Sequence, residues 1–213
     1  MLAATPQMLH SAVLCAKPRS RQNSFERNLR RLGVDSRTSA GYRAASDHGR
    51  NYNLLVRKVG SATIRKQALE QIKNVVAKTR TRAEQAKRAA EIIRAAGNYR
   101  WVGIYDVTDE TIAAVGWTGI EPPAYPVFPV TQGLCGAAVG SRAPVIVADV
   151  TKDTRYLTTF GSTRSEMIVP APSSDGKVVG VIDIESERVN AFAKSDARFV
   201  SECALALAGF WRS

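Results

Sequence analysis

The chain has 213 residues, of which 45% are hydrophobic and 23% are charged, and its formal net charge is +11. This length suits one domain with an extension, and the composition excludes collagen-like or wholly disordered material. Residues 1–97 carry a net charge of +14 and residues 98–213 a net charge of −3. Because the excess basic charge is confined to the first part, we do not expect a nucleic-acid partner for the folded part.

The cysteines and histidines exclude several kinds of site. Cys15, Cys135 and Cys203 are odd in number and far apart, which excludes a disulfide framework or a four-cysteine zinc site within the chain. Both histidines, His10 and His48, precede residue 61, so the second half has no histidine for acid–base catalysis or metal ligation. We therefore expect no metal, no cofactor and a cytoplasmic location.

Residues 1–60 are expected to form a basic, disordered extension, and residues 61–213 the domain. From Lys17 to Arg57 there is no sustained apolar period, and arginine, serine, asparagine and glycine dominate. The first residues are rich in arginine and serine, so a targeting segment or a start codon assigned too early stays open. The longest uncharged stretch of the second half, residues 122–141, contains four prolines and three glycines, so no membrane span is expected.

Two helices are predicted between Ile64 and Ala96. Apolar residues recur there at three- and four-residue spacing. Thr81 and Glu84 have the spacing of a capping box at the start of the second helix, and Gly97 would end it. Such narrow apolar stripes suit packing on a sheet or pairing of two copies, so a homodimer through these helices is one possible partner.

After Gly97 the apolar period shifts toward two, which predicts strands. In chain order we expect a hairpin (99–107 and 111–117), a proline-rich stretch (122–129), a short helix (133–139), a short strand (144–148), a polar loop (151–162), a second hairpin (167–171 and 177–185), and a last helix capped by Ser195. An antiparallel sheet with N- and C-terminal helices predicts an α+β fold.

The first strand places two aromatic residues on one face. Alternation puts Trp101 and Tyr105 on the same side, with Gly103 between them. The two rings would flank a floor that lacks a side chain, and this gap could admit a ligand. Alternatively, both rings fill the core and the glycine marks a bulge.

The last strand carries two acidic residues on one face. Asp183 and Glu185 alternate with isoleucines, and Glu166 begins the partner strand. Such carboxylates could lie on a solvated sheet face. If instead all three converge near Trp101 and Tyr105, they would suit an ammonium group through charge pairing and cation–π contact.

Cys135 lies near the predicted start of a helix. Free backbone N–H groups at Gly133–Gly136 could bind a carboxylate or phosphate, and they could lower the pKa of the thiol. The alternative is that Cys135 is a small buried hydrophobic residue.

Four segments together resemble the successive motifs of GAF domains, in particular the free methionine-(R)-sulfoxide reductase group: WVGIY (101–105), QGLCG (132–136), SEMIVP (165–170) and GVIDIES (180–186). The resemblance spans Ile64 to Trp211. It implies a GAF-like antiparallel sheet flanked by N- and C-terminal helices. It also implies that Cys135 matches a resolving cysteine and that a pocket for a free amino acid is lined by Trp101, Tyr105, Glu166, Asp183 and Glu185.

One departure from that group bears on function. Its attacking cysteine lies in the loop before the Ser-Glu motif, where residues 157–164 contain no cysteine and Thr159 is nearest the expected place. Reduction of a sulfoxide by this route requires a thiolate. We therefore expect a non-catalytic GAF-type binding or sensory domain for a small amine-bearing metabolite. The alternative is a free methionine-(R)-sulfoxide reductase that uses Cys135 alone with an external reductant.

Overall fold

The computed structural model describes residues 61–77 and 81–212. The predicted extension, residues 1–60, lies outside them. The elements are helical residues 61–77, α3 (Arg82–Gly97), β1 (Trp101–Val107), β2 (Thr111–Thr118), β3 (Val127–Pro129), α4 (Gly133–Ser141), β4 (Val145–Val147), the 3-10 helix η1 (Val150–Lys152), β5 (Ser165–Pro172), β6 (Val178–Ser186), α5 (Lys194–Ala206) and the 3-10 helix η2 (Phe210–Arg212). No helix within the described residues is long and apolar enough to cross a membrane.

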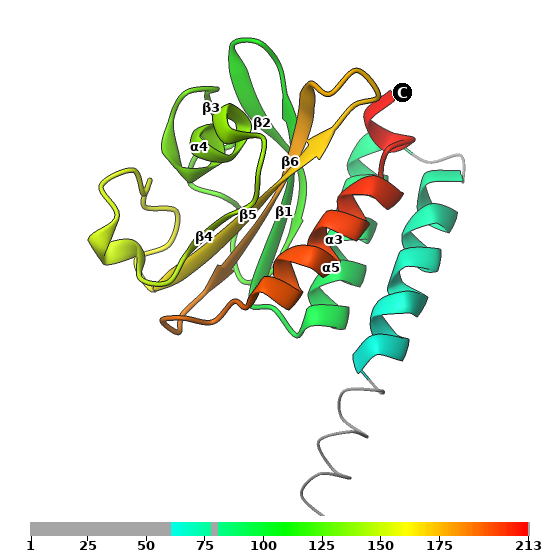
Figure 1. Ribbon diagram of the computed structural model, residues 1–213, viewed down its shortest axis with the longest axis horizontal. Helices are drawn as coiled ribbons and strands as arrows, with labels where there is room; N and C mark the ends of the chain where they lie inside the picture. Colours follow the sequence, from blue (N-terminus) through cyan, green and yellow to red (C-terminus); the bar gives the residue numbers. More distant parts are fainter. Residues whose placement is uncertain (1–60, 78–80, 213) are drawn as a thin grey trace, which may run out of the picture. The chain divides into compact units, whose positions relative to one another are not determined.

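The strands form one antiparallel six-stranded sheet in the order β3-β2-β1-β6-β5-β4. Helices α3 and α5 and the helix of residues 61–77 lie on one side of the sheet, whereas α4 lies on the other (Figure 1). This arrangement confirms the predicted α+β fold. Strands β1 and β6 are central, so their side chains are buried on both faces.

The alternation in β6 divides the interior into two cores. Ile182 and Ile184 pack into the core beneath the helices. Asp183 and Glu185 point to the opposite face, where a second apolar cluster lies between the sheet and α4. The acidic residues are therefore placed on the α4 side by the same period that buries the isoleucines.

Helix α3 begins as predicted. The Thr81 hydroxyl accepts a hydrogen bond from the Glu84 N–H at 3.3 Å, and the Glu84 carboxylate accepts one from the Thr81 N–H at 3.1 Å. The helix ends one residue later than expected, because Asn98 and not Gly97 adopts the left-handed conformation, with φ of 52°. Position 97 requires glycine for a steric reason. A Cβ there would lie 2.1 Å from the Tyr99 ring.

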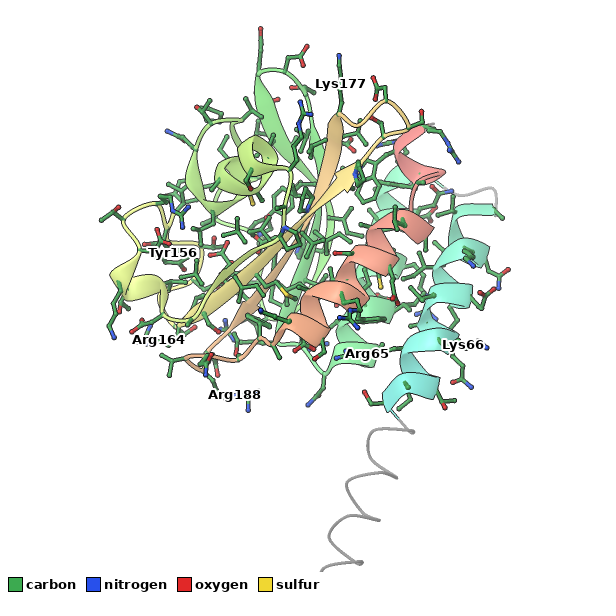
Figure 2. All side chains as sticks on the ribbon, in the orientation of Figure 1. Arg65, Lys66, Tyr156, Arg164, Lys177 and Arg188 are labelled. Atoms are coloured by element: carbon green, nitrogen blue, oxygen red, sulfur yellow. The ribbon has the colours of Figure 1, made fainter. Side chains whose placement is uncertain are left out.

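Helix α5 does not begin as predicted. Its N-cap residue is Ala193, and Ser195 is already helical. The carboxylate of Asp196 accepts a hydrogen bond from the Ala193 N–H at 3.0 Å, so an acidic residue in the first turn replaces a capping hydroxyl. The same carboxylate forms an ion pair with Arg65 at 2.5 Å, which links α5 to the helix of residues 61–77. Arg65 is labelled in Figure 2.

The predicted apolar stripe of the helix of residues 61–77 packs into the core of its own chain. Ala68, Ile72 and Val75 are buried in the core beneath the helices. Pairing of two copies through these helices stays a prediction, and it would have to use residues outside this buried stripe.

Strand β3 was not predicted, because its sequence is interrupted by prolines. It pairs with β2 at the edge of the sheet, with Pro129 opposite Thr111. An edge strand tolerates proline because one side of its backbone has no strand to pair with.

Candidate functional site

Three acidic side chains are buried on the α4 side of the sheet. Glu166, Asp183 and Glu185 are 5%, 3% and 0% exposed. Glu166 lies directly opposite Glu185 in the β5–β6 ladder, and Asp183 is two residues along β6. The structure therefore excludes the solvated sheet face and brings the three carboxyl groups together.

A pocket lies between these carboxyl groups and α4. Its free volume is about 20 Å³, which is room for about one water molecule. Tyr105, Cys135, Glu166 and Asp183 line it, four of the six residues singled out in the sequence. The other lining residues are Tyr125, Phe128, Gly133, Leu134, Leu157 and Thr159. A metabolite could enter only if the lining loops moved.

Trp101 and Glu185 are buried beside this pocket but do not line it. The Trp101 ring packs edge-to-face on Phe160, with 5.6 Å between the ring centroids, and its N–H donates to the Glu121 carbonyl at 3.0 Å. Glu185 accepts a hydrogen bond from the Thr163 hydroxyl. Both residues are thus covered by the loop that precedes β5.

The predicted ligand gap over Gly103 is not open. A Cβ on Gly103 would lie 2.4 Å from the Trp101 ring and 2.7 Å from the Tyr105 ring. The two rings fold over the glycine and fill the space themselves. A bulge lies nearby, between Ile104 and Tyr105, where Val115 of β2 is the additional residue.

The pocket is rich in hydrogen-bond acceptors and poor in cations. Burial is the main cause that raises the pKa of all three carboxyl groups, and the charge of Asp183 further raises the pKa of Glu166. Each group has one buried oxygen without a hydrogen-bond partner in the described part of the chain: Glu166 Oε2, Asp183 Oδ1 and Glu185 Oε1. No lysine or arginine is among the described residues that line the pocket.

The thiol of Cys135 is not activated. Burial and the three neighbouring carboxylates raise its pKa well above the usual range. Of the two alternatives for Cys135, the structure favours the small buried residue over the thiol with a lowered pKa, because desolvation and negative charge outweigh the helix terminus. Burial also raises the pKa of Cys203, which lies in the core beneath the helices.

Two buried residues of the loop that covers this site were not predicted from the sequence. Phe160 and Thr163 are both buried, although they fall in or beside a stretch read only as a polar loop (Figure 2 labels its neighbours Tyr156 and Arg164). A single phenylalanine in an otherwise polar loop was the available signal. Tyr125 and Phe128 also line the pocket, but they fall in the proline-rich stretch and were not predicted as site residues.

Comparisons with known proteins agree with this architecture. Residues 81–209 match the family model of the GAF domain. A free methionine-R-sulfoxide reductase of Saccharomyces cerevisiae is 38% identical over 73 residues, which are 34% of this chain and only 41% of the yeast protein. The X-ray structure of free methionine-R-sulfoxide reductase from Neisseria meningitidis in complex with its substrate is 29% identical, covers 70% of this chain and 88% of its own, and superposes with a TM-score of 0.62. The structure of type II free methionine-R-sulfoxide reductase from Thermoplasma acidophilum is 28% identical, covers 66% of this chain and 95% of its own, and superposes with a TM-score of 0.58. The chain belongs to the GAF domain family.

Proposed function

We propose that this GAF domain binds a small metabolite that carries an ammonium group, and that it does so without catalysis. The observation that carries the proposal is the set of three buried carboxyl groups, each with an unpaired oxygen. Buried acceptors without partners are costly. An ammonium group brings three donors and a positive charge, so it would satisfy the unpaired oxygens of Glu166 and Asp183, the two carboxyl groups that line the pocket.

The rest of the pocket suits the remainder of an amino acid. Tyr105 and Phe128 pack edge-to-face, with 6.1 Å between their ring centroids. Leu134 and Leu157 add apolar surface. The first residues of α4 also line the pocket, and free N–H groups at a helix start can bind a carboxylate. Both ends of a zwitterion would then have partners.

The thiol chemistry argues against catalysis. Among the described residues, Cys135 is the only cysteine that lines the pocket, and its raised pKa keeps it protonated at neutral pH. Thr159 lines the same pocket, and the resemblance implies that it is the residue nearest the place of the attacking cysteine in the related reductases. A threonine hydroxyl cannot form a sulfenic acid.

The test is a thermal-shift and calorimetric screen of free amino acids, including L-methionine and its (R)-sulfoxide. A bound amino acid at a hundredfold excess over its dissociation constant stabilises by about 2.7 kcal/mol. N-acetyl-L-methionine, which lacks the ammonium group, should not bind. Asp183→Asn should abolish the shift, whereas Asp149→Asn, a change in a surface turn, should retain it. The absence of any amino-acid binder would overturn the proposal.

The second candidate is a single-cysteine free methionine-(R)-sulfoxide reductase. It is favoured by the relatives named above and by the position of Cys135 on the pocket. The thiolate would attack the sulfoxide sulfur, release methionine and become a sulfenic acid. Two external thiols would then return it to the thiol, with water and a disulfide as products. Thioredoxin-dependent turnover that is lost in Cys135→Ser supports this candidate, and no turnover excludes it.

A further inference from the structure

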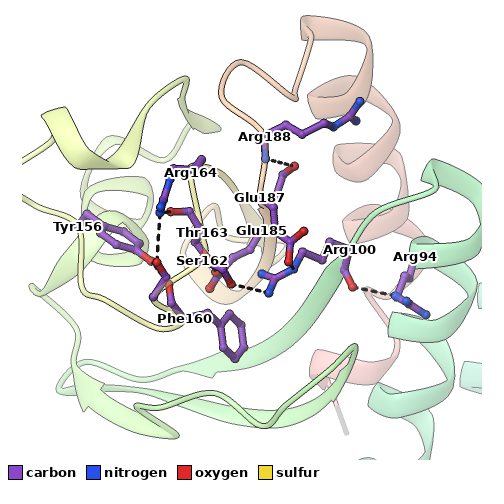
Figure 3. A network of polar contacts seen from close by, with 12 residues as sticks. Arg94, Arg100, Tyr156, Phe160, Ser162, Thr163, Arg164, Glu185, Glu187 and Arg188 are labelled. Atoms are coloured by element: carbon purple, nitrogen blue, oxygen red, sulfur yellow. Dashed lines mark hydrogen bonds and ion pairs between the residues drawn. The ribbon is translucent and has the colours of Figure 1, made fainter.

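Arg100 joins three parts of the chain just before β1. Its Nε forms an ion pair with Glu187 Oε1 at 2.8 Å, and its Nη2 donates to Ser162 Oγ at 2.7 Å. The guanidinium carbon lies 5.5 Å from the centre of the Phe160 ring. Figure 3 shows the side chain reaching from the strand start to the loop that precedes β5. The Arg100 side chain is only 14% exposed.

The loop of residues 157–164 covers the acidic site. Leu157 and Thr159 line the pocket, Phe160 packs on the Trp101 ring, and Thr163 donates to Glu185. Backbone hydrogen bonds hold the end of the loop, from Thr163 N–H to the Phe160 carbonyl and from Arg164 N–H to the Ser186 carbonyl. The middle of the loop is therefore held closed largely by side chains.

The free volume of about 20 Å³ requires this loop, or another wall, to move before an amino acid can enter. If the loop moves, the contacts of Arg100 with Ser162 and Phe160 must break. The contacts of Arg100 with Glu187, and of its carbonyl with Arg94 Nε at 3.0 Å, can persist because those partners lie outside the loop. Arg100 can therefore keep its position through its contacts outside the loop, while its contacts with Ser162 and Phe160 connect it to the loop.

We propose that Arg100 is the positioning residue that holds loop 157–164 closed over the acidic pocket and so controls access to it. The inference rests on the proposed function in one respect, that a ligand enters this pocket. A planar guanidinium suits the role, because it can donate to Glu187 and Ser162 while it stacks on Phe160. The Arg100 Nη1 atom is buried without a partner in the described structure, so the closed arrangement leaves one donor unsatisfied and does not lock the loop irreversibly.

Alkylation of Cys135 reports on this loop without any ligand. Cys135 is 5% exposed and lines the pocket, whereas Cys203 is 0% exposed in the core beneath the helices. The full chain is treated with iodoacetamide, and the modification of each cysteine is followed by peptide mass spectrometry. Cys203 serves as the internal measure of global unfolding.

Arg100→Met should increase the alkylation rate of Cys135 roughly tenfold, the scale of one lost charge-assisted hydrogen bond in a local opening equilibrium. The rate of Cys203 should not change. Ser162→Ala removes the hydrogen bond from Arg100 but leaves the contact of Arg100 with the Phe160 ring, so it should give a smaller increase. Arg155→Met is the matched control, because that arginine pairs with Asp153 in the preceding turn and should leave the Cys135 rate unchanged.

An unchanged Cys135 rate in Arg100→Met would overturn the proposal, and so would a parallel rise at both cysteines. The two proposals fail separately. Faster Cys135 alkylation together with no amino-acid binding would retain the role of Arg100 and remove the ligand class. Protection of Cys135 by L-methionine in the wild type, with no effect of Arg100→Met, would retain the pocket and remove the role of Arg100.

Discussion

Glu166 of β5 and Glu185 of β6 lie directly opposite each other across the β5–β6 ladder, and both carboxyl groups are buried. Like charges in such a pair destabilise a sheet when both are ionised. Asp183, on the same face, adds a third group. This strand pair is therefore poorly suited to stability alone, and an arrangement that works against stability is common at ligand sites.

Glu166→Gln should stabilise the ligand-free protein at pH 8. The amide keeps the shape of the side chain, but it removes one buried ionisable group. We expect an increase of about 1–2 kcal/mol in the free energy of unfolding, measured by urea denaturation. Glu121→Gln, at an exposed position, should change it by less than about 0.5 kcal/mol. A destabilised Glu166→Gln protein would show that the carboxylate has a stabilising partner.

The stability of the ligand-free protein should fall as pH rises. The pKa of each of the three carboxyl groups is raised in the folded state, so the folded chain binds more protons than the unfolded chain above the ordinary carboxyl pKa. The contribution of these groups is fully present below that ordinary pKa and is lost as pH rises through the raised values.

Urea denaturation from pH 4 upward measures this dependence. Glu166→Gln should make the decline shallower, because one of the three coupled groups no longer titrates. An ammonium ligand should displace protons from the site, so calorimetry in buffers of different ionisation enthalpy should show proton release on binding. Identical slopes for the wild type and Glu166→Gln would contradict the assignment.

The faces of the strands could be predicted from the sequence because period two is a local property. Ile182 and Ile184 alternate with Asp183 and Glu185, and this pattern alone places the acids opposite the main core. What the pattern cannot contain is the loop that buries them. Thr163 reaches Glu185, and Phe160 packs on Trp101, through tertiary packing that no local period encodes.

The space over Gly103 and the pKa of Cys135 likewise depend on tertiary packing. A glycine between two aromatic residues left open either a gap for a ligand or rings that fill the core, and in the structure both rings occupy the space. A cysteine at a helix start could have a lowered pKa, but burial and the three carboxyl groups of β5 and β6 raise the pKa of Cys135 instead. The helix start alone favours a lower thiol pKa, but burial and the charged groups that the fold places nearby determine whether the pKa is lowered or raised.

Gly103→Ala should destabilise the protein and disturb the aromatic pair. The new methyl group would lie 2.4 Å from the Trp101 ring, so the ring would have to move. Overpacking of this kind costs about 1–3 kcal/mol, and near-ultraviolet circular dichroism should report the change around the tryptophan. Gly140→Ala is the control, since nothing lies within 4 Å of its Cβ and it lies in α4. A near-neutral Gly103→Ala would mean that the rings have room to spare.

Thr159→Cys should introduce sulfoxide reductase activity. Residue 159 and Cys135 line the same pocket, so the variant places two thiols there. The introduced thiolate would attack the sulfur of methionine sulfoxide, release methionine and become a sulfenic acid. Cys135 would then displace water from that sulfur and form a disulfide, which thioredoxin reduces. The reaction needs no further residue, provided that the pocket admits the substrate.

Thioredoxin-dependent NADPH consumption with L-methionine-(R)-sulfoxide measures the gain. The rate should rise with pH, because burial and the acidic neighbours disfavour thiolates in this pocket. Thr158→Cys places a thiol at an exposed neighbouring position and should remain inactive. Addition of Cys135→Ser to Thr159→Cys should stop formation of the internal disulfide. If Thr159→Cys folds but consumes no NADPH, the pocket does not present a sulfoxide sulfur to residue 159, and its ligand must be sought among other amines.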